Sequence, residues 1–174
     1  SGIGAAITAR LDRAGWSVVL VDQDEAGLQD VAARLTGLSK VVSGDVRDAA
    51  THERAALEAR GLGPLMGWVN CAGVSRPTPL LECTEDDLRA VFDVNFAGTV
   101  WGCASAVRAM LAQPESGAIV NISSVHGIRA YPDHPLYEAS KAAIDALTRS
   151  VGVTYADQGV RCTAVAPGGV LTPA

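Results

Sequence analysis

The segment NISSVHGIRAYPDHPLYEASKAAIDAL, residues 121–147, links an apolar run to an alanine-rich stretch through a polar loop. The apolar run 118–122 is typical of a buried strand, and Ser124 stands where that strand ends. Good helix formers follow the loop and predict a helix that carries Tyr137 and Lys141. The segment therefore predicts a strand, a loop and a helix, the unit that recurs in α/β folds.

Tyr137 and Lys141 are four positions apart, so their side chains share one helix face, with Cβ atoms about 5 to 6 Å apart. An ammonium group beside a phenol favours the phenolate, and a phenol that can lose and regain its proton is a general acid and base. Ligands of an open parallel sheet bind at the carboxyl ends of its strands, which places Ser124 beside the pair. An exposed helix face would carry the same two residue types, so the pair needs further support.

The rest of the chain alternates between strand-like and helix-like segments. Strands are predicted at 17–21, 40–43, 66–70, 118–122 and 161–166, and helices at 5–14, 25–35, 49–60, 84–112 and 137–155. Thr84 and Asp87 are spaced as in a capping box. The alternation predicts a parallel sheet with helices on both faces and right-handed crossovers.

Composition indicates one soluble globular domain, because 48% of the 174 residues are hydrophobic and 19% are charged. The net charge of −5 and the lack of a Lys/Arg cluster argue against a nucleic-acid-binding surface. No apolar run approaches the roughly 18 residues of a membrane-spanning helix. We therefore expect neither a nucleic acid nor a membrane as a partner.

The four cysteines, Cys71, Cys83, Cys103 and Cys162, are widely spaced and form no C-x-x-C pair. Free cysteine is often a small buried hydrophobic residue, and Cys71 and Cys162 lie in or beside apolar runs. We expect reduced thiols in a cytoplasmic protein, with no metal site and no cysteine nucleophile.

Short motifs along almost the whole chain occur in the order and at the spacing of one known family. They are Ser1-Gly2-Ile3-Gly4, Asp22, Asp45-Val46, Asn70-Cys71-Ala72-Gly73, Asn95, Ile122-Ser123-Ser124, Tyr137-x-x-x-Lys141 and Pro167-Gly168-Gly169-Val170-x-Thr172. The chain resembles the short-chain dehydrogenases/reductases. The resemblance implies a single dinucleotide-binding and catalytic domain over 1–174, built as a doubly wound, Rossmann-like parallel sheet in three α/β/α layers. It also implies an NAD-dependent oxidoreductase that interconverts a secondary alcohol and a ketone.

Both ends of the chain differ from this pattern. The family has a strand before residue 1, and a substrate lid, a helix and a last strand after residue 172, so we expect a chain truncated at both ends. In the family's strand order the first strand lies between 18–21 and 66–70. Without it, those two strands are expected roughly two strand spacings, about 9 to 10 Å, apart.

The predicted cofactor end begins at Gly2 and Gly4, which precede a helix and let its free N–H groups approach a pyrophosphate. A structural turn would show the same glycines. Asp22 follows a strand and can accept hydrogen bonds from the adenosine ribose hydroxyls, although a solvated turn aspartate would also fit. Because a 2′-phosphate there would meet a like charge, and because Ser1 and Gln23 are neutral, we expect NAD rather than NADP.

Further cofactor contacts are implied by the resemblance. Asp45 faces the adenine amino group, Val46 faces the adenine ring, Ala72 and Gly73 allow close approach of the backbone, and Asn70 braces the end of the sheet. The implied cofactor-binding residues are Ser1, Gly2, Ile3, Gly4, Asp22, Asp45, Val46, Asn70, Ala72, Gly73, Tyr137, Lys141, Pro167, Gly168, Val170 and Thr172.

The implied catalytic residues are Asn95, Ser124, Tyr137 and Lys141. In the family, Tyr137 would exchange a proton with the substrate oxygen, Ser124 would hold that oxygen, and Lys141 would bind the nicotinamide ribose. Asn95, a poor helix former within a predicted helix, would bend the helix and hold a water molecule that links Lys141 to solvent.

Several residues near Tyr137 remain undecided by sequence. His126 and His134 lie in the preceding loop, where a solvated or pocket-wall position is more frequent than a catalytic one. Ser75, Arg76, Trp101 and Tyr131 are pocket walls or surface residues.

The predicted helices 96–110 and 137–155 carry apolar residues beyond a single stripe, so each needs a second partner. The resemblance implies a homotetramer or homodimer packed through these helices. Two other functions remain open: an NAD-using sugar epimerase or dehydratase, and a non-catalytic dinucleotide sensor or scaffold. The substrate is also open, with sugar alcohols, steroids, 3-oxoacyl thioesters and small hydroxy compounds as candidates.

Overall fold

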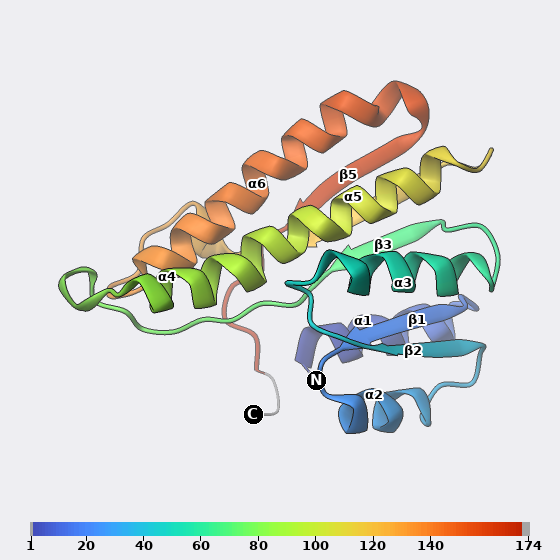
Figure 1. Ribbon diagram of the computed structural model, residues 1–174, viewed down its shortest axis with the longest axis horizontal. Helices are drawn as coiled ribbons and strands as arrows, with labels where there is room; N and C mark the ends of the chain where they lie inside the picture. The colour runs from blue at the N-terminus through green and yellow to red at the C-terminus, as the bar shows by residue number, and fades with distance from the viewer. Residues whose placement is uncertain (1, 172–174) are drawn as a thin grey trace.

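The computed structural model describes residues 2–171 and shows parallel strands alternating with helices (Figure 1). The strands are β1 (Val18–Asp22), β2 (Ser39–Ser43), β3 (Gly67–Asn70), β4 (Gly117–Ile122) and β5 (Val160–Val165). The α-helices are α1 (Gly2–Arg13), α2 (Glu25–Ala32), α3 (Ala49–Arg60), α4 (Glu85–Phe92), α5 (Gly98–Leu111) and α6 (Pro135–Tyr155). The predicted α/β alternation is confirmed, and α3 has the predicted bounds.

The strands form two parallel groups. β1 pairs with β2, and β4 pairs with β3 on one side and β5 on the other. In the described part of the chain β1 and β3 are not hydrogen-bonded to each other, which is the separation expected between strands 18–21 and 66–70. Within each group the strands are in parallel register, so their carboxyl ends lie along the same edge, where Asp22, Asn70 and Ile122 end their strands.

Helices form layers on the two faces of the strands. α1 and α2 pack on β1 and β2, and α3 packs against the same strands and against α5. α5 and α6 pack on β3, β4 and β5. The predicted three layers therefore surround β1 and β2. On the strands β3 to β5 the described helices cover one face, and the side chain of Val165 stays 49% exposed.

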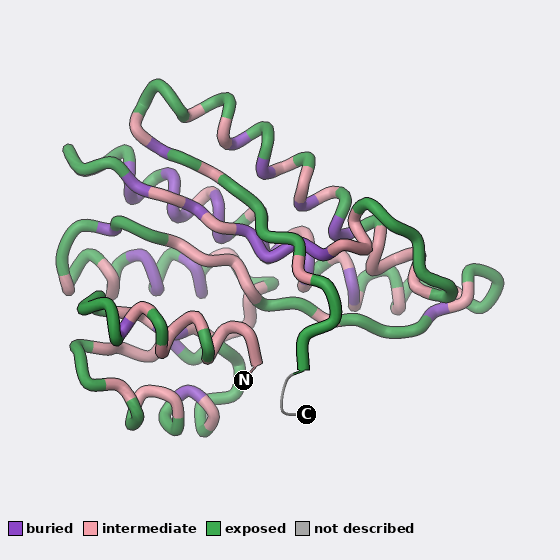
Figure 2. The backbone as a smooth tube through the Cα atoms, turned by 180° about the vertical axis from the view of Figure 1, so that it is seen from behind, coloured by how far each residue is buried: buried purple, intermediate pink, exposed green. Residues whose placement is uncertain are grey.

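The core lies between β4 and the helices α5 and α6. Figure 2 shows the buried residues concentrated on β4 and on the inner sides of these helices. Ile119, Ile144 and Val160 are each at most 1% exposed, and Ala106 is fully buried. Burial of such aliphatic side chains is worth about 1.5–3 kcal/mol each, so this core fixes α6, and with it Tyr137, against the end of β4.

Local sequence explains where the helices begin and end. Gly15 has φ +83°, a left-handed conformation that suits glycine, and it follows the end of α1. Thr84 and Asp87 form the predicted capping box at the start of α4. α6 begins at Pro135, two residues earlier than predicted, because proline suits the first turn, where its missing N–H is not needed. α2 ends at Ala32, earlier than the predicted residue 35.

The predicted helix 84–112 is interrupted. Residues Asp93–Ala97 form a π-helical turn between α4 and α5, with Asn95 at its centre. A π turn adds one residue to the turn and changes the direction of the residues that follow.

The helical stretch Glu85–Leu111 is 27 residues long, and its most apolar 18-residue window has a mean hydropathy of 1.2, enough by length and composition to cross a membrane. Half of that window is buried inside the protein, against β3, β4 and neighbouring helices. This is the usual environment of a core helix.

Candidate active site

Tyr137 and Lys141 lie on the same side of α6. The Lys141 Nζ is 5.6 Å from the centre of the Tyr137 ring, and it donates a hydrogen bond of 2.8 Å to the Ile122 carbonyl at the end of β4. Lys141 is only 4% exposed. Burial lowers the pKa of Lys141, while the neighbouring Cys71 and Asp145 act to raise it. The strand end thus fixes a buried ammonium group beside the phenol.

Ser124 is 5% exposed and follows β4 directly after Ser123. Its Oγ accepts a hydrogen bond of 3.1 Å from the His126 backbone N–H. Within residues 2–171 the Ser124 hydroxyl donates to no other group, so its proton is free for a ligand. The loop returns toward α6, where the His126 ring lies 6.3 Å from the Tyr137 ring, centre to centre.

Asn95 is fully buried, and its side-chain amide connects three segments. Its Oδ1 accepts a hydrogen bond of 2.7 Å from the Val74 N–H, and its Nδ2 donates one of 2.9 Å to the Val74 carbonyl. The same Nδ2 donates at 3.0 Å to Ser140 Oγ, which donates at 2.7 Å to the Tyr137 carbonyl. The Asn95 carbonyl accepts the Thr99 hydroxyl at 2.7 Å. A π turn lies at Asn95, where a bend is predicted, and the side chain acts as a clamp between the loop after β3 and α6.

Ser140 was not singled out in the sequence, although it is fully buried and joins Asn95 to the turn of α6 that carries Tyr137. A signal was available. Serine is a poor residue for a helix interior unless its hydroxyl bonds within the fold, and this one directly precedes Lys141.

The residues after β3 pass close to Lys141. A Cβ atom on Gly73 would lie 3.3 Å from Asn95 Oδ1 and 3.4 Å from Lys141 Nζ, closer than most real Cβ contacts. Ala72 and Gly73 are both exposed. An exposed backbone this close to the ammonium group fits the cradle expected for a nicotinamide ribose.

The start of α1 fits an anionic group. Gly2 has φ +56°, and the first turn, which includes Ile3 and Gly4, contains no acidic side chain. The first N–H groups of a helix have no partner within the helix and attract negative charge. A Cβ on Gly4 would meet Cys71 Sγ at 3.7 Å, so this end of α1 lies against the residues that follow β3. Ser1 lies outside the described residues.

Asp22, Asp45 and Val46 lie together at the carboxyl ends of β1 and β2, because the Gly44 N–H donates at 2.9 Å to the Asp22 carbonyl. The exposed Asp22 carboxylate accepts the Asp24 N–H at 3.2 Å. Asp45 and Val46 are partly buried. This edge could therefore present carboxylates to the hydroxyls of a ribose and an apolar side chain to a ring.

Asn70 joins β3 to β4. Its Nδ2 donates at 2.8 Å to Asn121 Oδ1, and its Oδ1 accepts the Trp68 indole N–H at 2.8 Å. Asn121 Nδ2 donates at 2.9 Å to Thr148 Oγ1 on α6. These contacts brace the strand ends from within the core, and they place Asn70 beneath the site rather than on its surface.

The segment after β5 contributes one contact. The Pro167 carbonyl accepts the Val125 N–H at 3.0 Å, so this segment runs beside the Ser124 loop. Gly168 and Val170 are exposed, and no described hydrogen bond ties them to Tyr137 or Lys141. Thr172 lies outside the described residues.

The undecided loop residues are now placed. The Tyr131 ring lies 5.2 Å from the His126 ring and 5.3 Å from the His134 ring, and it is 57% exposed. His126 Nδ1 is buried and has no hydrogen-bond partner among the described atoms. His126 and Tyr131 therefore form an aromatic wall next to Tyr137.

The remaining undecided residues, Ser75, Arg76 and Trp101, are exposed. No three His, Cys, Asp or Glu side chains between residues 2 and 171 lie close enough together to hold a metal ion.

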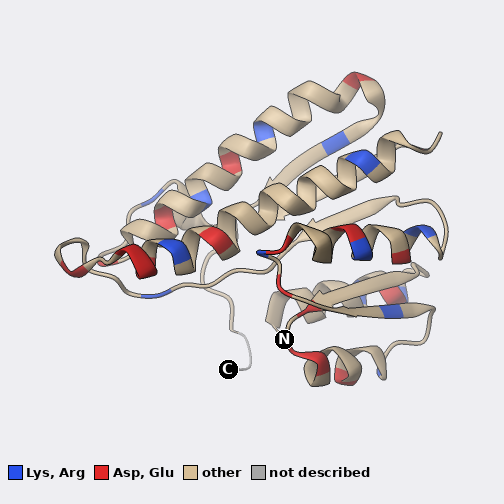
Figure 3. Ribbon diagram, in the orientation of Figure 1, with Lys and Arg blue, Asp and Glu red and all other residues tan. Residues whose placement is uncertain are grey.

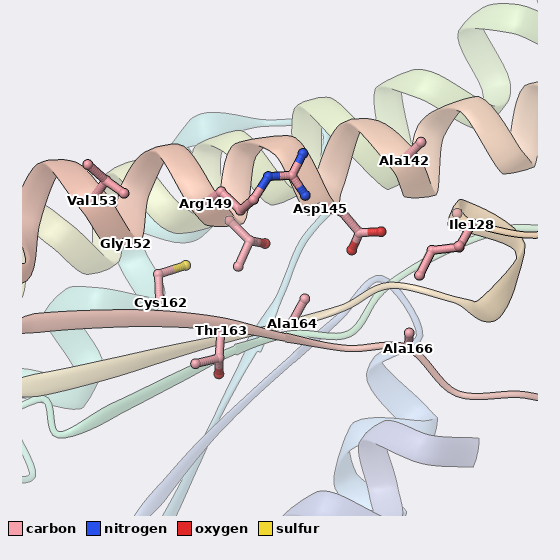
Figure 4. Close-up of a pocket in the computed structure, with 12 residues that line it drawn as sticks. Ile128, Ala142, Asp145, Arg149, Gly152, Val153, Cys162, Thr163, Ala164 and Ala166 are labelled. Carbon is pink, nitrogen blue, oxygen red and sulfur yellow. The ribbon is translucent and has the colours of Figure 1, made fainter.

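A groove of about 770 Å³ lies between α6 and β5 (Figure 4). Asp145 and Arg149 of the helix and Cys162 and Ala164 of the strand are among the residues that line it. Neither Ser124 nor the Tyr137–Lys141 pair lines it. The groove is therefore separate from the candidate site.

Comparison with known proteins identifies relatives of this chain. The family model for short chain dehydrogenase matches residues 1–174. The chain is 38% identical over 179 residues to the 3beta-hydroxysteroid dehydrogenase of Mediterraneibacter gnavus, covering 99% of this chain and 64% of that protein. It is 36% identical over 175 residues to the galactitol 2-dehydrogenase (L-tagatose-forming) of Cereibacter sphaeroides, covering 99% of this chain and 68% of that protein. The crystal structure of a short chain dehydrogenase from Mycobacterium smegmatis matches with a TM-score of 0.93 at 29% identity, covering 97% of this chain and 72% of that one.

Proposed function

The chain belongs to the short-chain dehydrogenase family, and we propose that it is an NAD-dependent oxidoreductase that interconverts a secondary alcohol and a ketone. The chain spans 64 to 72% of the length of the three relatives described, so the activity proposed is that of the protein to which this sequence belongs. One observation carries the proposal. The buried Lys141 ammonium, held by the Ile122 carbonyl at 2.8 Å, lies 5.6 Å from the centre of the Tyr137 ring.

The contacts of each residue support the role proposed for it. Ser124 donates a hydrogen bond from its hydroxyl group to the substrate oxygen and keeps its proton. Tyr137 gives a proton to that oxygen when a ketone is reduced, and takes one from it when an alcohol is oxidised. Lys141 uses one N–H on Ile122 and directs its remaining protons toward the phenolate and the nicotinamide ribose hydroxyls. When bound, the dinucleotide supplies or accepts the hydride.

Asn95 supports this arrangement without touching the reacting atoms. Its bonds to Val74 and Ser140 hold the loop after β3 and the turn of α6 that carries Tyr137 at a fixed separation. Reacting groups must be held within a fraction of an ångström for efficient transfer, so a buried amide that joins the cofactor side to the catalytic helix serves that requirement.

NAD is the cofactor that the strand ends favour. The Asp22 carboxylate is exposed at the end of β1, with Asp24 two residues further on. A ribose 2′-phosphate would meet this negative charge, whereas free hydroxyls would donate hydrogen bonds to it.

The proposed assembly is a homodimer or homotetramer through α5 and α6. Trp101 and Leu111 on α5 are 40% and 42% exposed, and Val153 on α6 is 84% exposed. Apolar side chains exposed along two neighbouring helices favour a second copy as their partner.

A cytoplasmic location is proposed from the thiols, because Cys103 and Cys162 both lie 3.6 Å from the Asn121 amide and remain free.

A screen of alcohols with NAD and with NADP tests the proposal. Because the relatives named above include a hydroxysteroid and a galactitol dehydrogenase, the panel contains 3β-hydroxysteroids and sugar alcohols together with small hydroxy compounds. The expected result is one NADH formed per ketone, with NAD preferred over NADP. Turnover of a sugar without net NADH formation would instead identify an epimerase or dehydratase, and NADH binding without turnover of any alcohol would identify a sensor.

A further inference from the structure

The Asp45 carboxylate is held almost entirely by Arg47, two residues further along the chain. Asp45 Oδ1 accepts the Arg47 backbone N–H at 2.9 Å. Asp45 Oδ2 accepts the Arg47 Nε–H at 2.9 Å and the Nη2–H at 2.5 Å. Figure 3 shows acidic and basic residues meeting in this segment between β2 and α3. These bonds to Arg47 also lower the pKa of Asp45, so the group is a carboxylate with a fixed orientation.

The neighbouring residue, Val46, is fixed from the other side. His52 on α3 is 5% exposed, and its Nε2 lies 2.8 Å from the Val46 carbonyl. Gly98, the first residue of α5, approaches so closely that a Cβ there would meet Val46 Cγ2 at 3.1 Å. The contacts with α3 and α5 fix Val46 beside Asp45, and Arg47 fixes the Asp45 side chain.

A carboxylate has about four lone-pair positions. Arg47 occupies three of them, both positions on Oδ2 and one on Oδ1. No other described residue donates to the remaining position on Oδ1. The carboxylate therefore offers a single acceptor in one direction, which matches one N–H of an exocyclic amino group and repels a carbonyl oxygen in the same place.

We propose that Arg47 is a specificity-determining positioning residue for the adenine end of the dinucleotide. It turns the Asp45 carboxylate so that one oxygen lone pair accepts the 6-amino group of adenine. The proposal rests on the proposed function, since it takes Asp45 as the adenine contact. Arg47 itself does not touch the reacting atoms.

The test compares two dinucleotides that differ at position 6 of the purine and in the proton on the adjacent N1. NADH carries an amino group there, and reduced nicotinamide hypoxanthine dinucleotide carries a carbonyl oxygen. Their dissociation constants are measured by the fluorescence of the bound reduced nicotinamide, without any turnover. Wild-type protein is expected to bind NADH at least about tenfold more tightly, the value of one hydrogen bond to a charged group.

Arg47→Ala is expected to weaken NADH binding by about five- to tenfold and to change binding of the hypoxanthine analogue by less than about twofold. Arg47→Lys keeps the charge but lacks the planar guanidinium group, which donates two hydrogen bonds to one carboxylate oxygen. This variant is therefore also expected to lose the preference for NADH over the hypoxanthine analogue. Arg54→Ala is the matched control. Arg54 lies in the same region and donates to the Ser43 carbonyl at 3.2 Å, so its loss leaves the preference unchanged.

Three results would overturn the inference. Equal weakening of both dinucleotides by Arg47→Ala would mean that Arg47 acts through the fold or a phosphate. If Arg47→Lys preferred NADH over the hypoxanthine analogue as strongly as the wild type does, a positive charge alone would be sufficient. If the wild-type protein showed no such preference, the proposed contact between Asp45 and adenine would be wrong. Failure of the proposed function is read separately from the alcohol screen, because these affinities are measured without turnover and a sensor or an epimerase would still bind NADH.

Discussion

Replacing Asn95 with alanine removes three hydrogen bonds in a fully buried site, those with the Val74 N–H, the Val74 carbonyl and Ser140 Oγ. A typical intramolecular hydrogen bond contributes about 1 kcal/mol net, and a buried group left without a partner costs about 1–3 kcal/mol. The expected loss in the free energy of unfolding is therefore about 3–4 kcal/mol. For a chain of this size, such a loss lowers Tm by roughly 6–16 °C.

Asn95→Ala is expected to lose more activity than partial unfolding of the variant can explain. Asn95 holds the loop before Val74 against the turn of α6 that carries Tyr137, so the folded variant is expected to lose about ten- to a hundredfold in kcat/KM. Urea unfolding followed by circular dichroism gives the stability, and turnover measured well below Tm gives the activity of the folded fraction.

Gln113→Ala is the matched control for this variant. Gln113 also bonds both the N–H and the carbonyl of one residue, Leu65, at 2.9 and 3.1 Å. It lies beyond the opposite end of α5 from Asn95, before the amino ends of β3 and β4, whereas the candidate site lies at the carboxyl ends of these strands. It is expected to lose about 1–2 kcal/mol of stability with kcat/KM unchanged. The reasoning is refuted if Asn95→Ala is destabilised by less than about 1 kcal/mol, or if its folded fraction is as active as that of Gln113→Ala.

Three further variants test separate parts of the site. Gly73→Ala places a methyl group 3.4 Å from Lys141 Nζ and should weaken NADH binding several-fold in a fluorescence titration, and unchanged affinity would place the ribose elsewhere. Asp22→Ser should raise kcat/KM for NADP relative to NAD by about tenfold or more, because a like charge near the 2′-phosphate is removed; an unchanged ratio would exclude Asp22 from the ribose. Burial lowers the pKa of His52 in the folded protein, so as the pH falls below 6.5 the imidazole is protonated more readily in the unfolded chain than in the folded one. The free energy of unfolding of the wild type should therefore fall more steeply with decreasing pH than that of His52→Phe, measured by urea unfolding at several pH values. Equal pH dependence in the two proteins would contradict a lowered pKa of His52.

Sequence patterns predicted the elements whose causes are local. The capping box at Thr84 and Asp87 is built from residues three apart, and the shared face of Tyr137 and Lys141 follows from helical spacing alone. The bounds of α3 agree because Asp48 caps its start and Gly61 directly follows its end. These features need no knowledge of the rest of the chain.

The π turn at Asp93–Ala97 was not predicted as such, because its stabilising contacts are distant in sequence. Asn95 reaches back to Val74 and forward to Ser140, 21 and 45 positions away. The Lys141 bond to the Ile122 carbonyl is of the same kind, since only the packing of α6 on β4 brings the two together. The position of such contacts is decided by the tertiary structure and not by local propensity.

The bond between Asp45 and Arg47 could have been anticipated. The two residues are two positions apart, in a loop where an aspartate readily accepts hydrogen bonds from nearby backbone and side-chain donors. Sequence assigned a role to Asp45 through the family resemblance and passed over the arginine that fixes it.

Tyr137→Phe is the variant that addresses the proposed chemistry most directly, because it removes one hydroxyl group and keeps the ring beside Lys141. Turnover of an alcohol identified by the screen and NADH affinity are measured on the same preparation. The account predicts a fall in kcat of about 10²- to 10⁴-fold, with the dissociation constant of NADH within about twofold of wild type. Turnover within about tenfold of wild type would show that another group carries the proton.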